Sequence, residues 1–597
     1  MTFQKSALAT ACALAGMMIV STPAMAIGGA SGPHVGYPTT GKIGAVNLNP
    51  YGIAPLTAVI RNGGYTVTDV SVRIVPKEGG QEIAYKVSDT QVRTHGGIPV
   101  FGLYPDWRNT VEVSYTKTSE GKSERVEKEA YKIYAGPANI ATAGYAGVKS
   151  VFPKAKVRKM SKEFEDRLYL INNMIAATPN PMGGALEWNR YPQNAIYDTK
   201  GELRWYMEPS RIYDPDNVYK AGIMMGFRQN NDGAFTWGYG QRYVKYDLMG
   251  REVFNRRLPD GYADFSHAMD PMQNGNYLVR VASSDHVRPD GKHVHTVRDV
   301  IIEVDPNGQV VDEWRLWDIL DPYRDTVLQG AVCLNIDASQ AGKTLSAEEL
   351  ARMDQNDKFG DIVGSGAGRN WVHVNSVDYD PTDDSIIISS RHQGIVKIGR
   401  DKKIKWILAS PEGWKKGWAE KVLTPVDAKG NKIKCEGSKC EGDFDWSWTQ
   451  HTAWRIDSKS DKNVIYLSVF DNGDARGMEQ PALPTMKYSR AVVYKIDQKK
   501  MTVEQIWEVG KDLGYPFFCP VTGLTKYMED KDTMMVYWST AGLGATPEKR
   551  TNTLGRVMPH IAEYRWGETK PVVDIELKDT FGYQAFPISV EKAFTKN

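Results

Sequence analysis

The sequence predicts an all-β protein, a six-bladed β-propeller preceded by an N-terminal β-sandwich domain. The first observation behind this prediction is a recurring hairpin: an apolar strand-like run, a polar turn, and a second apolar or aromatic run. It occurs six times, around Asp198, Asp247, Asp305, Asp401, Asp497 and Trp566. The second observation is that three of the units place a histidine directly before a strand-like run. Such repetition is typical of a closed ring of similar sheets, which leaves no long sheet edge exposed.

The first 26 residues have the pattern of a secretory signal peptide. Lys5 gives a positive start, residues 7–20 form an apolar run too short to span a bilayer, and Ala24-Met25-Ala26 fits a cleavage site. We therefore expect cleavage after Ala26 and an exported protein. No later stretch reaches about 18 consecutive apolar residues, so we expect no membrane span.

Residues 27–150 contain short alternating runs separated by glycine-rich turns, which favours a small β-sandwich. Residues 161–174 have apolar spacing compatible with one helix, which would connect this domain to the propeller at residues 151–597. In the repeated hairpins, aspartate, asparagine and glycine suit the turn. Long insertions lie ahead of two histidine units, at residues 328–369 and 410–445, and insertions on one face of a ring usually build or cover a binding site.

The charge balance and the missing motifs exclude several classes of function. With 74 basic and 72 acidic residues and no basic cluster, nucleic acid is not an expected partner. The Gly-x-Ser-x-Gly, P-loop and HExxH motifs are absent, which argues against the commonest hydrolases and nucleotide-binding proteins. His293 and His295 alternate and could belong to a metal site, but no third ligand accompanies them at a diagnostic spacing. We therefore expect neither a metal nor a cofactor.

The cysteines indicate one local disulfide. Cys435 and Cys440 enclose four residues, two of them small and turn-forming. In an exported protein a disulfide is the favoured interpretation, and two free thiols are the alternative. Zinc is less favoured because no second ligand pair has suitable spacing. So small a ring would mainly stiffen the loop that leads to His451. The pairing of Cys333 and Cys519 stays open.

The candidate functional residues are His267, His373 and His451, which occupy equivalent places in the repeat. A ring that brings the same point of several units to one axis would gather them in one pocket. Asn375 follows His373 at a spacing of two, so both side chains would face the same way on a strand. Arg391 ends the next apolar run, and a strand that turns back would return it near His373. A single histidine at a strand start is more often structural, but three at equivalent positions favour function.

Four motifs, FSHAMD, NWVHVNSVDYD, IIISSRHQG and WSWTQHTAW, closely resemble those of the bacterial arylsulfate sulfotransferases, and they occur here in the same order. The resemblance covers essentially the whole mature chain. It implies a periplasmic homodimer that moves a sulfuryl group from a phenolic sulfate ester to a phenol without a nucleotide sulfate donor. It also implies a transiently sulfated His451, with the sulfuryl oxygens held by His267, His373, Asn375 and Arg391. The family's short disulfide near the active site matches Cys435 and Cys440.

The residue types suit this chemistry. A neutral imidazole, whose ordinary pKa is about 6.5, can attack sulfur and later leave again. Arg391 offers a planar fork for two sulfuryl oxygens. His373 is our candidate for the acid that protonates the leaving phenolate and for the base that activates the acceptor. The side chains of Trp446, Trp448 and Trp454 would either form walls for a phenyl ring or pack in the core between blades.

Two other functions have less support in the sequence. A non-catalytic periplasmic propeller that scaffolds envelope proteins would not need three histidines and an arginine at equivalent inner positions. A quinone-dependent dehydrogenase would show repeated tryptophan-docking motifs and calcium-binding carboxylates, and neither is evident. Six units also argue against the larger ring of that class.

Overall fold

The computed structural model is built almost entirely of β-strands. It describes residues 43–138, 152–175, 191–212, 224–283, 286–287, 293–294, 297–321, 324, 372–415, 417–478, 483–543, 557–578 and 580–595. The expected cleavage site after Ala26, the division between domains at residues 150 and 151, and the insertion at 328–369 all lie outside the described residues. Within them, no helix combines the length and the apolar character needed to cross a membrane.

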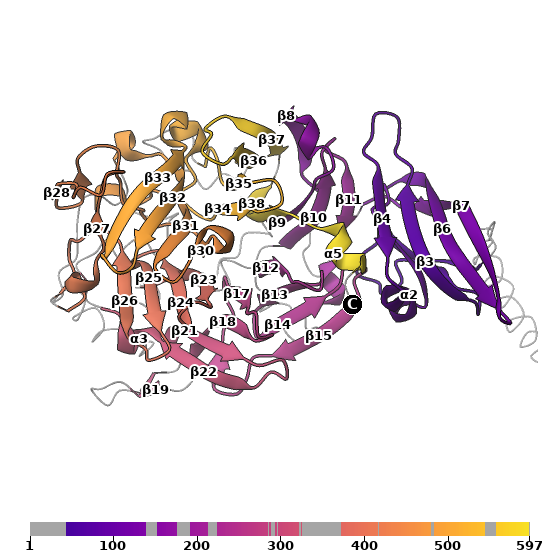
Figure 1. The fold of residues 1–597 in the computed structure, drawn as a ribbon, viewed down its shortest axis with the longest axis horizontal. Helices are drawn as coiled ribbons and strands as arrows, with labels where there is room; N and C mark the ends of the chain where they lie inside the picture. Colours follow the sequence, from indigo (N-terminus) through magenta and orange to yellow (C-terminus); the bar gives the residue numbers. More distant parts are fainter. Residues whose placement is uncertain are drawn as a thin grey trace, which may run out of the picture.

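The N-terminal domain is a sandwich of two antiparallel sheets, as predicted, and it lies at one end of the molecule (Figure 1). One sheet contains β1 (Val46–Leu48), β2 (Thr57–Arg61) and β5 (Gly97–Phe101). The other contains β4 (Ile83–Val87), β3 (Thr66–Ile74), β6 (Trp107–Ser119) and β7 (Lys122–Ala135). Buried and exposed residues alternate along β4, so that one face of this sheet packs on the core. The short helix α2 (Asp89–His95) begins at Ser88, whose side chain caps it, and ends at Gly96, whose left-handed φ of 63° favours glycine.

The rest of the described chain forms six sheets arranged as a ring (Figure 1). From its inner strand outward, the first sheet contains β38 (Phe581–Pro587), β9 (Leu168–Ile175), β10 (Tyr191–Asp198) and β11 (Leu203–Tyr206). In the same order, the second sheet contains β12 (Met225–Gln229), β13 (Phe235–Tyr239), β14 (Arg242–Tyr246) and β15 (Glu252–Arg257). The third sheet contains β16 (Tyr262–Ala263) and β17 (Met269–Pro271), which both pair with β18 (Tyr277–Ser283), followed by β21 (Val297–Val304) and β22 (Val310–Arg315). The fourth sheet contains β23 (Val374–Asp380), β24 (Ser385–Ser390), β25 (Gly394–Gly399) and β26 (Ile404–Leu408). The fifth sheet contains β30 (Ala453–Arg455), β31 (Val464–Asp471), β32 (Arg490–Asp497) and β33 (Thr502–Val509). The sixth sheet contains β34 (Leu524–Met528), β35 (Thr533–Trp538), β36 (His560–Arg565) and β37 (Pro571–Lys578). The six-bladed propeller is thus confirmed.

The six predicted hairpins join the two outer strands of the six sheets. The turns at Asp198, Asp247 and Asp305 show why the motif recurs. In each, the aspartate carboxylate accepts the backbone N–H groups two and four residues later, at 2.8–3.0 Å. A glycine with φ between 83° and 89° follows three residues after the aspartate. The side chain therefore closes the turn, and glycine supplies the left-handed backbone that the turn needs.

Two strand pairings close the ring. The C-terminal strand β38 pairs with β9, joining Phe581 to Met174 and Pro587 to Tyr169. The first strand of the propeller, β8 (Lys154–Met160), pairs with β37 at the outer edge of the last sheet. The two ends of the propeller chain are thus hydrogen-bonded to each other's sheets, and the ring has no open seam.

The helix expected at residues 161–174 is wrong. One 3-10 turn, η1 (Lys162–Phe164), is followed directly by strand β9. Because β9 has a partner strand on each side and both of its faces are covered, Leu168, Tyr169, Leu170 and Ile171 are all buried. A strand buried on both faces is continuously apolar, and a short run of this kind does not differ from a helix in its spacing.

The sandwich is attached to the ring partly by the C-terminal helix α5 (Val590–Thr595). Phe594 stacks on Tyr85 of the sandwich, with ring centroids 4.7 Å apart, and its carbonyl accepts the N–H of Ser88. Arg204 of β11, fully buried, forms an ion pair with Asp198 and donates to two backbone carbonyls of the sandwich. These contacts link the two domains through buried groups.

The predicted disulfide between Cys435 and Cys440 is present. It crosses a small hairpin made of β28 (Cys435–Glu436) and β29 (Lys439–Cys440). The same insertion adds β27 (Thr424–Pro425) in parallel to β33, so it extends the fifth sheet. Cys519 is a buried free thiol, and Cys333 lies outside the described residues. The remaining short elements are α3 (Leu316–Ile319), β19 (His286–Val287) and β20 (His293–Val294).

Candidate active site

The three candidate histidines all lie immediately before inner strands of the ring. His267 precedes β17, His373 precedes β23 and His451 precedes β30. His267 and His373 have left-handed backbones, with φ of 66° and 52°, and the residue after His451, Thr452, has φ of 81°. Each histidine therefore lies in a tight turn just before the inner strand of its sheet. Such strained positions recur at functional sites, where the surrounding structure holds them in place.

The ring brings these three imidazoles together, although they come from three different sheets. The Nε2 atoms of His267 and His373 are 3.3 Å apart, so that one donates a hydrogen bond and the other accepts it. The ring centroids of His267 and His451 are 6.1 Å apart. Tyr583 of β38 completes the cluster, with its ring 5.3 Å from that of His451. The predicted convergence of the three histidines is therefore confirmed.

His451 has an imidazole with one hydrogen-bonded and one free nitrogen. Nδ1 lies 2.9 Å from the carbonyl oxygen of Gly523, which can only accept, so Nδ1 carries the proton. Nε2 therefore holds the lone pair, and it is buried without a partner. Burial lowers the pKa of His451 to about 3, with a further contribution from the positive charge of Arg391, and the bond to Gly523 opposes these effects. The ring is neutral at physiological pH, with an unengaged lone pair.

His373 is neutral for similar reasons. Its pKa lies well below the ordinary value because of burial first, and then because of the neighbouring His267, Arg391 and other basic groups. Its partner His267 is also hydrogen-bonded through Nδ1 to the hydroxyl of Ser266. The two rings thus form a short chain in which a proton can pass from one nitrogen to the next.

Arg391 supplies the positive charge of the cluster. Its backbone N–H donates to the carbonyl of His373 at 3.1 Å, so the predicted return of Arg391 to His373 is confirmed. The guanidinium donates to the carbonyl of Pro520 at 2.9 Å and lies 3.5 Å from a carboxylate oxygen of Asp474. Its Nε is buried and has no partner. One donor of a buried cation is therefore available to a ligand.

Asn375 contacts the protein chain on both sides of His451. Its amide nitrogen donates to the carbonyl of Gln450 at 2.7 Å, and its amide oxygen accepts the N–H of Thr452 at 3.0 Å. The expectation that His373 and Asn375 share one face of a strand is wrong, because His373 precedes β23 and the strand's register shifts at Asn375. These two hydrogen bonds suit Asn375 to position the backbone on both sides of His451.

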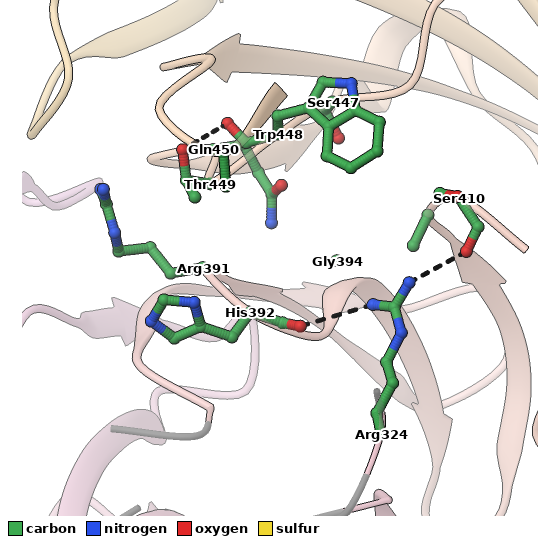
Figure 2. Close-up of a pocket in the computed structure, with 11 residues that line it drawn as sticks. Arg324, Arg391, His392, Gly394, Ser410, Ser447, Trp448, Thr449 and Gln450 are labelled. Atoms are coloured by element: carbon green, nitrogen blue, oxygen red, sulfur yellow. Dashed lines mark hydrogen bonds between the residues drawn. The ribbon is translucent and has the colours of Figure 1, made fainter. Parts of the chain in front are cut away.

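A pocket lies directly beside Arg391, and Figure 2 shows the side chains around it. It has about 430 Å³ of empty space, counting its open mouth. Its lining residues are Arg324, Arg391, His392, Gly394, Ala409, Ser410, Ser447, Trp448, Thr449, Gln450 and Ala475. Of the three tryptophans considered as walls for a phenyl ring, Trp448 lines this pocket. Trp446 is buried in the core of the fifth sheet, and Trp454 packs against the guanidinium of Arg228.

Sequence reasoning missed two members of the cluster. His392 directly follows Arg391, and its ring centroid lies 6.2 Å from that of His373. It lies in the turn between β24 and β25, and its place next to Arg391 was the only signal for it. Tyr583 comes from the ring-closing strand, which no local pattern pairs with β9. The metal site considered at His293 and His295 is not tested, because His295 lies outside the described residues.

Comparison with known proteins agrees with this geometry. A family model described as arylsulfotransferase (ASST) matches residues 154–584, and one described as arylsulfotransferase Ig-like domain matches residues 45–136. The arylsulfate sulfotransferase AssT of Escherichia coli O6:H1 (strain CFT073) is 42% identical over 568 residues, which cover 90% of this chain and 91% of that protein. The arylsulfate sulfotransferase AssT of Lelliottia amnigena is 42% identical over 565 residues, covering 90% of each chain. A solved protein of unknown function from Bacteroides caccae matches 71% of this chain and 98% of its own with a TM-score of 0.35 and 10% identity, too weak a likeness to add to the fold. Because the family model and both relatives span most of the sequence, the chain belongs to the arylsulfotransferase family and is an aryl sulfotransferase.

Proposed function

We propose that this enzyme transfers a sulfuryl group from a phenolic sulfate ester to a phenolic acceptor through a sulfated His451, without a nucleotide sulfate donor. The observation that carries the proposal is the state of His451, whose Nε2 lone pair is buried and unengaged while Nδ1–H is held by the carbonyl of Gly523. The arylsulfate sulfotransferase names of the relatives support the substrate class. A non-catalytic scaffold has no observation in its favour.

The transfer takes place in two displacements at sulfur. The Nε2 lone pair of His451 attacks the sulfur, the bond from sulfur to the phenolic oxygen breaks, and the phenolate leaves with the electron pair. The oxygen of the second phenol then attacks the same sulfur, the sulfur–nitrogen bond breaks, and His451 regains its lone pair. Positive charge develops on the imidazole in the first step, and the Gly523 carbonyl stabilises it through Nδ1–H, as a carboxylate does in other catalytic histidine pairs.

The sulfuryl oxygens need hydrogen-bond donors in fixed positions. Arg391 is the main donor, because its guanidinium is buried and its Nε lacks a partner. His267 and His373 can donate from the opposite side of the hollow once substrate replaces their mutual bond. The contribution of Asn375 is to fix the backbone around His451, so that its ring meets the sulfur in one orientation.

His373 is the group best placed to take the acceptor's proton. Its lowered pKa leaves it neutral in the resting enzyme, which suits a base. Because the ring is not protonated before the first step, it has no extra proton for the leaving phenolate. Donors whose phenol is itself acidic, such as 4-nitrophenyl sulfate, should therefore react fastest. The chain from His373 to His267 provides a route for the proton.

Labelling of the nucleophile tests the proposal. Incubation with 4-nitrophenyl sulfate alone, followed by quenching without acid, should add one sulfuryl group to the peptide that contains His451, detected by mass spectrometry. His451→Ala should lose both the label and the turnover. His560→Gln is the matched control, because His560 pairs with Asp574 on the outer part of the last sheet and should keep both.

The kinetics give a second reading of the same proposal. Initial rates with varied donor and acceptor should produce parallel double-reciprocal lines, because the first product leaves before the acceptor reacts. An unlabelled His451 peptide together with intersecting lines would show direct transfer between the two substrates instead.

We further propose that the mature enzyme works in the periplasm as a homodimer. The N-terminal signal pattern and the Cys435–Cys440 disulfide support export to an oxidising compartment. Amino-terminal sequencing of secreted protein should begin at Ile27, and light scattering should give the mass of two chains. An uncleaved amino terminus, or the mass of one chain, would contradict the respective part.

A further inference from the structure

The pocket beside Arg391 is not needed to hold the migrating sulfuryl group, and its chemistry points to another part of the substrate. Arg391 and His392 lie on one side of it and Ser447 and Trp448 on the other (Figure 2), and Ala475 also belongs to its lining. Trp448 and the small residues give it an apolar wall. Because Arg391 borders both this pocket and the histidine cluster, one bound molecule can reach both.

Besides the Nε of Arg391, which is assigned to the sulfuryl oxygens, two polar atoms of the lining residues are buried and have no hydrogen-bond partner. They are Nε2 of His392 and Oγ of Ser447, and each belongs to a residue less than 7% exposed. Buried polar atoms in proteins are normally paired, so two unpaired atoms on one pocket indicate a missing ligand. Both atoms can donate a hydrogen bond. A ligand with two acceptor oxygens, such as a carboxylate, would satisfy both.

The charges around the pocket favour an anion. Two guanidinium groups, Arg324 and Arg391, belong to its lining, which contains no carboxylate. Arg324 stacks on Trp414 and donates to the backbone carbonyls of His392, Ser410 and Glu412. Burial lowers the pKa of Arg324 to about 9, which leaves it cationic at neutral pH. Asp474 lies 3.5 Å from Arg391, and Asp321 and Glu412 lie near Arg324, but none of these carboxylates belongs to the lining. The lining itself therefore presents cations and N–H donors to a ligand.

We propose that this pocket receives an anionic substituent on the aromatic ring of the acceptor, so that the enzyme prefers phenols that carry a carboxylate on a short side chain. The inference rests on the proposed function and adds the acceptor's chemical class to it. The hydroxyl of the acceptor lies at the sulfated His451, while the carboxylate reaches past Arg391 to His392 and Ser447. Phenols with a cationic side chain of the same length are disfavoured.

The test compares three acceptors of similar size, with 4-nitrophenyl sulfate as donor: 4-hydroxyphenylacetate, 4-ethylphenol and tyramine. We expect kcat/KM for the anionic acceptor to exceed that for the neutral one by on the order of tenfold, since hydrogen bonds to a charged group are involved. Tyramine should be the poorest. The preference should fall several-fold in Ser447→Ala and should be reversed towards tyramine in Ser447→Asp.

The matched control is Ser123→Ala, an exposed serine of the sandwich, which should keep the wild-type preference. Equal kcat/KM for the three acceptors in the wild type, or a preference for the anion that survives in Ser447→Ala, would overturn the inference. The Ser447→Ala result decides the matter if Ser447→Asp does not fold. Failure of the proposed function has a different signature, because His451 would then carry no label, whichever acceptors were sulfated.

Discussion

At the scale of single residues, the site depends on burial more than on unusual side chains. The same histidine in water would be half protonated near its ordinary pKa of about 6.5. Inside the ring, His451 loses contact with water and lies near the charge of Arg391, and both effects disfavour the protonated form. The Gly523 carbonyl then fixes which nitrogen keeps the proton. A neutral imidazole with an unengaged lone pair results from position alone.

The lowered pKa of His451 has a consequence for the pH dependence of the first step. A group whose pKa is lowered on folding stays in its neutral form above its unfolded value, and that form is lost only as the pH falls towards the folded value of about 3. The burst of 4-nitrophenol should therefore keep the same rate constant from about pH 8 to about pH 5, with no break near 6.5. Stopped-flow absorbance measures this burst, and circular dichroism at each pH checks that the protein stays folded. A loss of rate centred near 6.5 would mean that the nucleophile titrates like a solvated imidazole.

The proximity of the candidate site residues could be predicted from the sequence, but their detailed contacts could not. The position of His267, His373 and His451 in the repeat was sufficient, because equivalent points of a ring converge. The role of Asn375 depends on a register shift in β23, which turns its amide towards the backbone beside His451. His392 carries no pattern of its own, and only the turn after Arg391 brings its ring to the cluster.

At the scale of elements, the hairpins were the most predictable part of the fold. Their signal is local, because an aspartate accepts the N–H groups of its own turn and a glycine supplies the positive φ. Strand β9 was mistaken for a helix for the opposite reason. Its environment is set by partners on both sides, of which β38 lies about 400 residues away in the chain, and a single sequence contains no record of that pairing.

One hairpin aspartate also forms an ion pair with Arg204, the arginine that donates to two carbonyls of the sandwich, and replacement of this aspartate separates its two roles. Asp198→Asn keeps the oxygen that accepts the turn N–H groups but removes the charge that pairs with Arg204 at 2.8 Å, where both side chains are fully buried. An uncompensated buried guanidinium should lower the free energy of unfolding by about 3–5 kcal/mol. Urea unfolding followed by tryptophan fluorescence measures this change.

The control for that experiment is Asp232→Asn. Asp232 also accepts a turn N–H and forms an ion pair, with Lys245, but its side chain is 45% exposed. A solvated pair of this kind contributes at most about 1 kcal/mol. Equal, small effects of the two substitutions would show that the buried Asp198–Arg204 pair contributes no more to stability than a solvated pair does.

At the scale of the whole molecule, closure of the ring and formation of the site are the same event. The histidines come from the third, fourth and fifth sheets, Gly523 from the start of the sixth, and Tyr583 from the strand that closes the first. Each of these sheets is built mainly from local hairpins, and only β8 and β38 pair across the full length of the propeller. The site therefore depends on the pairings with the largest separation in sequence, whose closure has the highest entropic cost.

Two truncations separate ring closure from domain attachment. Removal of residues 590–597 takes away α5, whose Phe594 is buried against Tyr85, but leaves β38 in place. This variant should lose about 3 kcal/mol of stability, as expected when a buried phenylalanine is lost, and should keep the burst of 4-nitrophenol. Removal of residues 580–597 also takes away β38, exposes the edge of β9 and deletes the Tyr583 ring beside His451. This longer deletion should abolish the burst and promote association through the open edge, measured by stopped-flow absorbance and light scattering. A full burst from the longer deletion would mean that the histidines converge without a closed ring.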